Sequence, residues 1–149
     1  MNATHGIRKL AVAGLGAAVL LMAGCAEMTS FVHGGQTINL SLSGSQEVPP
    51  VSTNARGEGT VTIADDGSVS GNVRTMGMEG VAAHIHTGAR GQNGPVAVGL
   101  VKTGDNTWGF PAGARLNEAQ MADYKAGNTY VNVHSPTYKG GEIRAQLVQ

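Results

Sequence analysis

The chain of 149 residues has few charged side chains, fewer aromatic ones and a single cysteine. With Cys25 alone, no intramolecular disulfide can form. Charged residues make up 13% of the chain and no basic cluster occurs, which argues against nucleic acid as a partner. The apolar run Leu10–Leu21 is shorter than the about 20 residues that a membrane-spanning helix needs.

Signatures of catalysis are also scarce. No Ser-His-Asp or Cys-His arrangement stands out, and no pair of carboxylates is grouped for hydrolysis. The segment 87–95 is rich in glycine, but it lacks the following helix and the Lys-Ser/Thr pair of a phosphate-binding loop. The sequence leaves an enzymatic activity open and does not favour one.

The N-terminal segment has the order of a signal peptide: basic residues at Arg8 and Lys9, then the apolar run. The run ends at Leu21-Met22-Ala23-Gly24-Cys25, which resembles the bacterial lipobox. That resemblance implies cleavage before Cys25 and lipidation of its thiol and its new amino group. We therefore predict a signal peptide over 1–24, a lipidated tether over 25–35 and one folded domain over 36–149. The alternative is an ordinary signal peptide followed by an incidental cysteine.

This processing predicts where the protein resides. By analogy with Gram-negative lipoproteins, Ala26 in place of an aspartate favours the outer membrane, facing the periplasm or the surface. Removal of residues 1–24 takes away two basic residues and no acid, so the net charge falls from zero to −2. The predicted partners are a membrane, through the lipid, and a metal ion; the sequence names no protein partner.

Glycine is abundant, with 23 residues, and short segments of alternating polar and apolar residues follow one another from Gln36 onward. Strands are predicted over 37–42, 59–63, 68–74, 81–86, 96–101, 107–110, 130–134 and 142–147. A helix is predicted over 118–126, capped by Asn117 with Gln120 and ended by Gly127. The pattern predicts an all-β fold: an antiparallel Greek-key β-barrel or sandwich of seven or eight strands with one short helix.

Three histidines form the candidate site. His84 and His86 lie two residues apart in a predicted strand, so their side chains share one face, roughly 6–7 Å apart. His134 ends a second predicted strand. Imidazole suits copper, zinc and nickel, so the three residues predict a mononuclear metal site. The alternative is that each ring packs and hydrogen-bonds within the barrel, for example with Glu142 or Asn132.

Four motifs, in order, resemble the CHRD domain, a family first described in the secreted protein chordin. They are LSGSQEVPP at 42–50, AAHIHTG at 82–88, NGPV at 93–96, and AGNTYVNVH at 126–134 continued by GGEIRAQL at 140–147. The resemblance covers the chain from Gln36 to its end. It implies an extracellular binding module and defines no activity.

A weaker resemblance points to copper/zinc superoxide dismutase, a Greek-key barrel that holds copper partly through a His-x-His pair and ends in a Gly-x-Arg strand. His84, His86 and the segment Gly141–Arg144 are similar to that arrangement. With the extracytoplasmic setting, this favours copper over zinc. No further cluster of His and Asp supplies the bridging and zinc ligands, and no disulfide pair is present. We predict a membrane-anchored binding module that holds copper; the alternatives are a dismutase-like redox enzyme and a metal-free structural or adhesive domain.

Two charged residues within the motifs complete the candidates. Glu47 is expected either to accept a hydrogen bond from a histidine or to cap turn amides. Arg144 alternates with Ile143 and so faces away from it; we expect it to pair with a carboxylate, with an anion-guiding role as the alternative.

Overall fold

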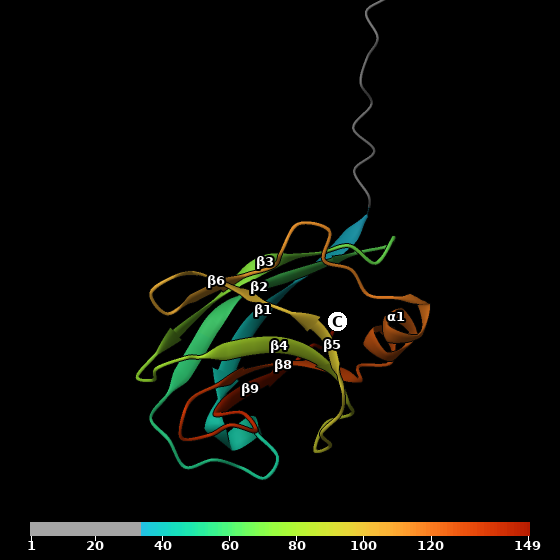
Figure 1. The fold of residues 1–149 in the computed structure, drawn as a ribbon. Helices are drawn as coiled ribbons and strands as arrows, with labels where there is room; N and C mark the ends of the chain where they lie inside the picture. Colours follow the sequence, from blue (N-terminus) through green and yellow to red (C-terminus); the bar gives the residue numbers. More distant parts are fainter. Residues whose placement is uncertain (1–33) are drawn as a thin grey trace, which may run out of the picture. The chain divides into compact units, whose positions relative to one another are not determined.

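A computed structural model describes residues 34–149, which form one antiparallel sheet of nine strands (Figure 1). The strands are β1 Gly35–Ser43, β2 Arg56–Ala64, β3 Val69–Met76, β4 Ala82–Thr87, β5 Val96–Gly99, β6 Val101–Gly104, β7 Thr107–Gly109, β8 Thr129–His134 and β9 Ile143–Gln146. The helices are the 3₁₀ turn η1, Gly44–Gln46, and α1, Glu118–Lys125. The predicted signal peptide 1–24 and Cys25 lie outside the described residues.

The strand order is β5-β4-β8-β9-β1-β2-β3-β7-β6. Although β5 and β6 stand at opposite ends of this order, only Leu100 separates them in the chain, so the sheet nearly closes into a barrel (Figure 1). The connections from β3 to β4 and from β7 to β8 each pass over intervening strands, as Greek-key connections do. The predicted all-β Greek-key fold with one short helix is confirmed.

One predicted strand is divided. The segment 96–101 was expected as a single strand, but β5 pairs with β4 and β6 pairs with β7, so the chain bends between them. At the bend, the Leu100 side chain is buried in the core and its N–H donates to the Ala83 carbonyl at 2.9 Å. The change of partner at Leu100 turns the eight predicted segments into nine strands.

Helix α1 begins at Glu118 as predicted and ends at Lys125, one residue before the predicted end. Asn117 Oδ1 accepts the Gln120 N–H and Gln120 Oε1 accepts the Asn117 N–H, both at 2.9 Å, which completes a capping box. Gly127 follows the helix with φ 73°, a conformation that glycine adopts without strain. The helix buries Tyr124 against the barrel core.

Strands β4, β8 and β9 present opposite chemistry on their two faces. Toward the core they place Ala83, Ile85, Val131, Val133 and Ile143, none more than 1% exposed. The outward face carries polar side chains instead, namely His84, His86, Tyr130, Asn132, His134, Arg144 and Gln146. Most of this outward face is buried as well, because the loops that follow β1 and β4 lie over it. It is therefore an enclosed polar layer outside the barrel.

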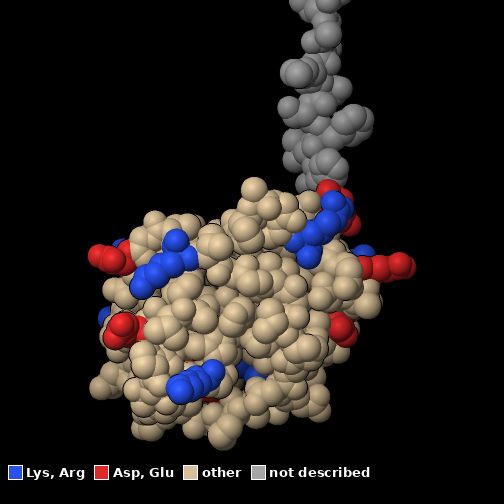
Figure 2. All heavy atoms as spheres, in the orientation of Figure 1, with Lys and Arg blue, Asp and Glu red and all other residues tan. Residues whose placement is uncertain are grey.

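Two general properties bear on partners. In the described part of the chain, no helix has the length and hydropathy needed to cross a bilayer. On the face shown in Figure 2, acidic and basic side chains are scattered among large uncharged areas, with no region of one sign.

Candidate metal centre

The three predicted histidines meet on the outward face of β4 and β8. Ala82 pairs with His134 and His84 with Asn132, so His134 lies diagonally opposite His84. Each ring offers one nitrogen, and the three nitrogens lie within 4.8 Å of one another. The closest pair, His84 Nδ1 and His134 Nε2, is 2.9 Å apart. The sequence-based prediction that these residues come together is confirmed.

Backbone carbonyls fix the tautomers of two rings. His86 Nδ1 lies 2.9 Å from the Gly94 oxygen, and His134 Nδ1 lies 2.9 Å from the Lys139 oxygen. Because a carbonyl only accepts, each Nδ1 carries the proton and each neutral ring keeps its lone pair on Nε2. This arrangement orients metal-binding histidines in many proteins.

His86 Nε2 is the unusual atom of the cluster. It is buried and has no hydrogen-bond partner among the described residues. Leaving such a group unpaired costs about 1–3 kcal/mol, and buried polar atoms are rarely left so. The neighbouring His84 ring lies 5.4 Å away, centroid to centroid. A metal ion bound among the three rings would satisfy this lone pair.

The surroundings of His84 and His134 favour the neutral form of these two rings. Burial, followed by the neighbouring His134 and His86, lowers the pKa of His84. Burial also lowers the pKa of His134, although the Lys139 carbonyl opposes this and His86 adds to it. Metal ions bind the neutral imidazole, so the pair stays in its metal-binding form at lower pH than free histidine does.

A cleft of about 370 Å³ gives access to the histidines. Its lining comprises Val81, Ala82, His84, His134, Ser135, Pro136 and Lys139. His84 and His134 are half-buried beside it, while His86 is buried behind them. Three ligands with an open side are the arrangement of metal sites that accept an external ligand.

Tyr130 and Gly94 hold His86 in place, and the sequence-based prediction missed both. The rings of His86 and Tyr130 stack with centroids 4.9 Å apart and planes at 4°. The Gly94 N–H donates to the Tyr130 hydroxyl at 3.2 Å, so the residue that fixes the His86 tautomer is itself fixed by the tyrosine. Because side chains alternate along a strand, the segment Thr129–His134 places Tyr130 on the same face as His134, which could have indicated its role.

Of the two charged residues, Glu47 takes the second of its expected roles and Arg144 needs correction. Glu47 accepts the Val48 backbone N–H and bonds the Asn132 side chain rather than a histidine; burial raises its pKa to about 7, against the opposing charge of Arg144. No carboxylate of residues 34–149 lies within ion-pair distance of Arg144, so the predicted pair is wrong. Arg144 lies over the Tyr130 ring instead, 3.4 Å from its centroid. The loops over the outward face supply this environment, and local alternation could not reveal it.

The alternative hydrogen bonds from the histidines to Glu142 or Asn132 are not formed either. Glu142 accepts a hydrogen bond from the Thr53 hydroxyl at 2.7 Å. Asn132 donates to the Gly140 carbonyl at 3.3 Å. The three rings lie outside the barrel core and interact with backbone carbonyls and with one another.

Gly94→Ala should destabilise the protein by about 1–3 kcal/mol, the usual range for overpacking. A Cβ at this position would lie 1.7 Å from the Thr87 oxygen, so the loop must move and withdraw its carbonyl from His86. Gly99→Ala is the matched control, because nothing lies within 4 Å of its added carbon. Thermal unfolding followed by circular dichroism measures both; equal melting temperatures for the two variants would contradict the prediction.

These features define an all-β domain with an enclosed polar layer and a three-histidine group on its outer face. The chain belongs to the CHRD domain family, whose model matches residues 38–147. All three histidines lie within that range. No match was found among curated proteins or among solved structures.

Proposed function

We propose that the protein is an extracytoplasmic CHRD-domain binding module that holds one copper ion through His84, His86 and His134. The observation that carries the proposal is the buried lone pair of His86 Nε2, which has no partner within residues 34–149 and belongs to a ring grouped with those of His84 and His134. Copper(II) ranks above zinc in affinity for nitrogen sites, which favours copper.

The separations suit a bound ion. Nitrogens bonded to one ion at about 2.0–2.1 Å lie about 3–4 Å apart. The 2.9 Å between His84 Nδ1 and His134 Nε2 is close to this range, and the widest separation of 4.8 Å needs to shrink by under an ångström. The N–H at His84 Nδ1 donates a hydrogen bond to His134 Nε2. If His84 Nδ1 binds the ion, its proton moves to Nε2 of the same ring. The ion thus replaces one hydrogen bond.

A copper titration of the purified, metal-free full chain tests the proposal. The chain should carry Cys25→Ser, because a free thiol is itself a copper ligand and Cys25 is the one cysteine of the sequence. We expect one Cu(II) per chain by calorimetry, and stabilisation of about 2.7 kcal/mol when free copper is 100 times the dissociation constant. Absence of binding tighter than micromolar would contradict the proposal and support a metal-free structural domain. A parallel zinc titration tests the choice of metal.

The dismutase alternative is less well supported. Within residues 34–149, His84, His86 and His134 are the one group of three side chains suited to a metal, whereas the resembled enzyme also needs zinc and bridging ligands. We therefore propose a binding role for the site. The binding role would be overturned if the copper-loaded chain consumed superoxide and lost this activity when a chelator removed the copper.

The membrane anchor is a separate part of the proposal. We expect Cys25→Ser to move the protein from the membrane to the soluble fraction, because the thiol that receives the lipid is lost. Ala26→Asp is the matched variant: it should keep the anchor and shift the protein from the outer to the cytoplasmic membrane. Immunoblots of separated membranes measure both, and unchanged fractionation of Cys25→Ser would refute the lipid anchor.

A further inference from the structure

A second cavity opens on the same outward face, on the far side of Tyr130 from His86. It has a volume of about 430 Å³, and its charged lining residues are Glu47, Arg90 and Arg144. Strands β4 and β9 flank β8, so Arg144 and His86 contact Tyr130 from opposite sides. The proposed copper site makes no use of this cavity.

Two arginines line this cavity, and no carboxylate of residues 34–149 forms an ion pair with either. Arg144 is 1% exposed, and Arg90 is exposed at the rim. Burial above all, and then the charge of Arg90, lower the pKa of Arg144, while Tyr130 and Glu47 oppose the shift. Neither arginine forms an ion pair within the described chain. Placing a second positive charge beside a buried guanidinium is unfavourable unless an anion compensates it.

Arg144 has N–H donors that form no hydrogen bond within the described chain. A guanidinium has five N–H groups. Three of them donate, to Asn93 Oδ1, the Ala89 oxygen and Gln146 Oε1, at 3.1–3.3 Å. The remaining two have no partner in the described chain. Gln146 is anchored in turn by bonds to the Gly88 and Gly127 carbonyls at 2.8 and 2.9 Å. The fork is therefore held in a fixed orientation, as recognition of a planar or tetrahedral oxyanion requires.

The acid beside the arginines neutralises them only in part. Burial raises the pKa of Glu47 to about 7, and even a fully ionised Glu47 offsets the charge of one arginine only. The cavity is then net positive. Val48 and Pro50 add apolar surface to its lining. A concave site with a few convergent polar groups and a perturbed carboxyl is the usual form of a small-ligand site.

We propose that this cavity binds a small organic anion, with the ligand's carboxylate or phosphate group held between Arg90 and Arg144. The apolar side chains contact the rest of the ligand. The site does not depend on copper.

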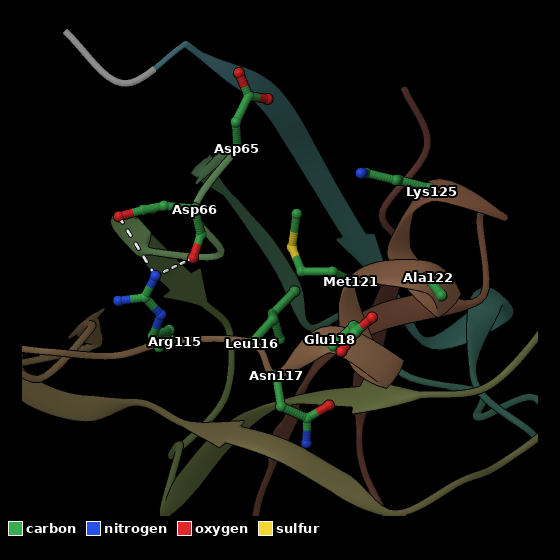
Figure 3. A pocket seen from close by; sticks show the side chains of 9 residues that line it. All are labelled: Asp65, Asp66, Arg115, Leu116, Asn117, Glu118, Met121, Ala122 and Lys125. Carbon is green, nitrogen blue, oxygen red and sulfur yellow. Dashed lines mark hydrogen bonds and ion pairs between the residues drawn. The ribbon is translucent and has the colours of Figure 1, made fainter. Parts of the chain in front are cut away.

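Another cavity provides the contrast and the control. In Figure 3, beside α1, Arg115 is joined by dashed lines to Asp66, with which it forms an ion pair at 3.5 Å and a hydrogen bond to the backbone oxygen. Arg115 is exposed like Arg90, but its charge is already compensated. Arg115→Gln therefore removes an exposed arginine without touching the proposed anion site.

Two anion titrations test the proposal. The metal-free full chain carrying Cys25→Ser is titrated with succinate and, separately, with inorganic phosphate. We expect saturable binding of at least one anion, with shifts of the Arg90 and Arg144 Nε–H and Gln146 side-chain amide signals in NMR spectra. The better ligand identifies the oxyanion class. Arg90→Gln should weaken binding at least tenfold and Arg115→Gln should not.

Three outcomes would overturn the proposal. Neither anion gives a saturable response at 10 mM, the NMR shifts are confined to residues outside the cavity, or Arg90→Gln and Arg115→Gln weaken anion binding equally. Arg90 is exposed, so its replacement leaves the fold intact, and the copper titration of Arg90→Gln should match that of the parent chain. The copper-site proposal and the anion-site proposal are therefore tested separately, and either can be wrong while the other holds.

Discussion

His86→Ala should weaken copper binding by more than about 100-fold, since loss of an outer-shell partner alone typically costs 10–100-fold. The residue supplies the buried nitrogen that no group of the described chain satisfies, and two further ligands cannot replace it. Calorimetric titration with Cu(II) measures the change in affinity.

His86→Phe separates ligation from packing. It keeps a ring against Tyr130 but removes both nitrogens, so the bond to Gly94 is lost together with the unpaired Nε2. We expect its melting temperature without metal to stay close to that of the parent chain, while copper no longer raises it. His33→Ala is the control, because His33 belongs to the predicted tether. Parental copper affinity in either His86 variant would rule out the three-histidine site.

The sequence predicted the faces of the strands correctly, because the two-residue period of a strand depends on nothing beyond the strand. It placed His84 with His86 and set Arg144 opposite Ile143. The meeting with His134 depends on the register that pairs it with Ala82, and such a register is set by the whole sheet. The resemblance to the CHRD family, whose motifs include both histidine segments, favoured this meeting.

The errors arose where distant segments meet. The apolar run 96–101 gave no sign of the bend at Leu100, which exists because the chain must pair with β4 and then with β7. Two of the three hydrogen-bond partners of Arg144, Asn93 and the Ala89 carbonyl, lie more than 50 residues earlier in the chain. Loops that fold back over a sheet are positioned by long-range hydrogen bonds, which local patterns do not encode.

Glu47→Gln should make the protein more stable at pH 8 and change its stability much less at pH 5. The folded-state pKa of Glu47 is about 7, against 4.5 as its ordinary value, so the folded chain holds this proton more tightly than the unfolded chain. The stabilisation from protonation is complete below the unfolded-state value and is lost as the pH rises through 7. At 1.36 kcal/mol per pKa unit, about 2–3 kcal/mol disappears between pH 5 and pH 8. Glutamine mimics the protonated carboxyl and has no such loss.

Comparison of two proteins at each pH isolates this effect from the other titrating groups. The lowered pKa values of His84 and His134 act in the opposite direction, because the unfolded chain then binds more protons, so stability rises with pH near their titration. These contributions are common to parent and variant and cancel in the difference. Urea unfolding at pH 5 and pH 8 gives that difference, with the exposed Glu58→Gln on β2 as the control that should follow the parent chain. The prediction fails if the difference in unfolding free energy between Glu47→Gln and the parent chain is the same at both pH values. Arg144 would then stabilise the carboxylate in the folded protein as well as water does in the unfolded chain, and burial would not control its charge.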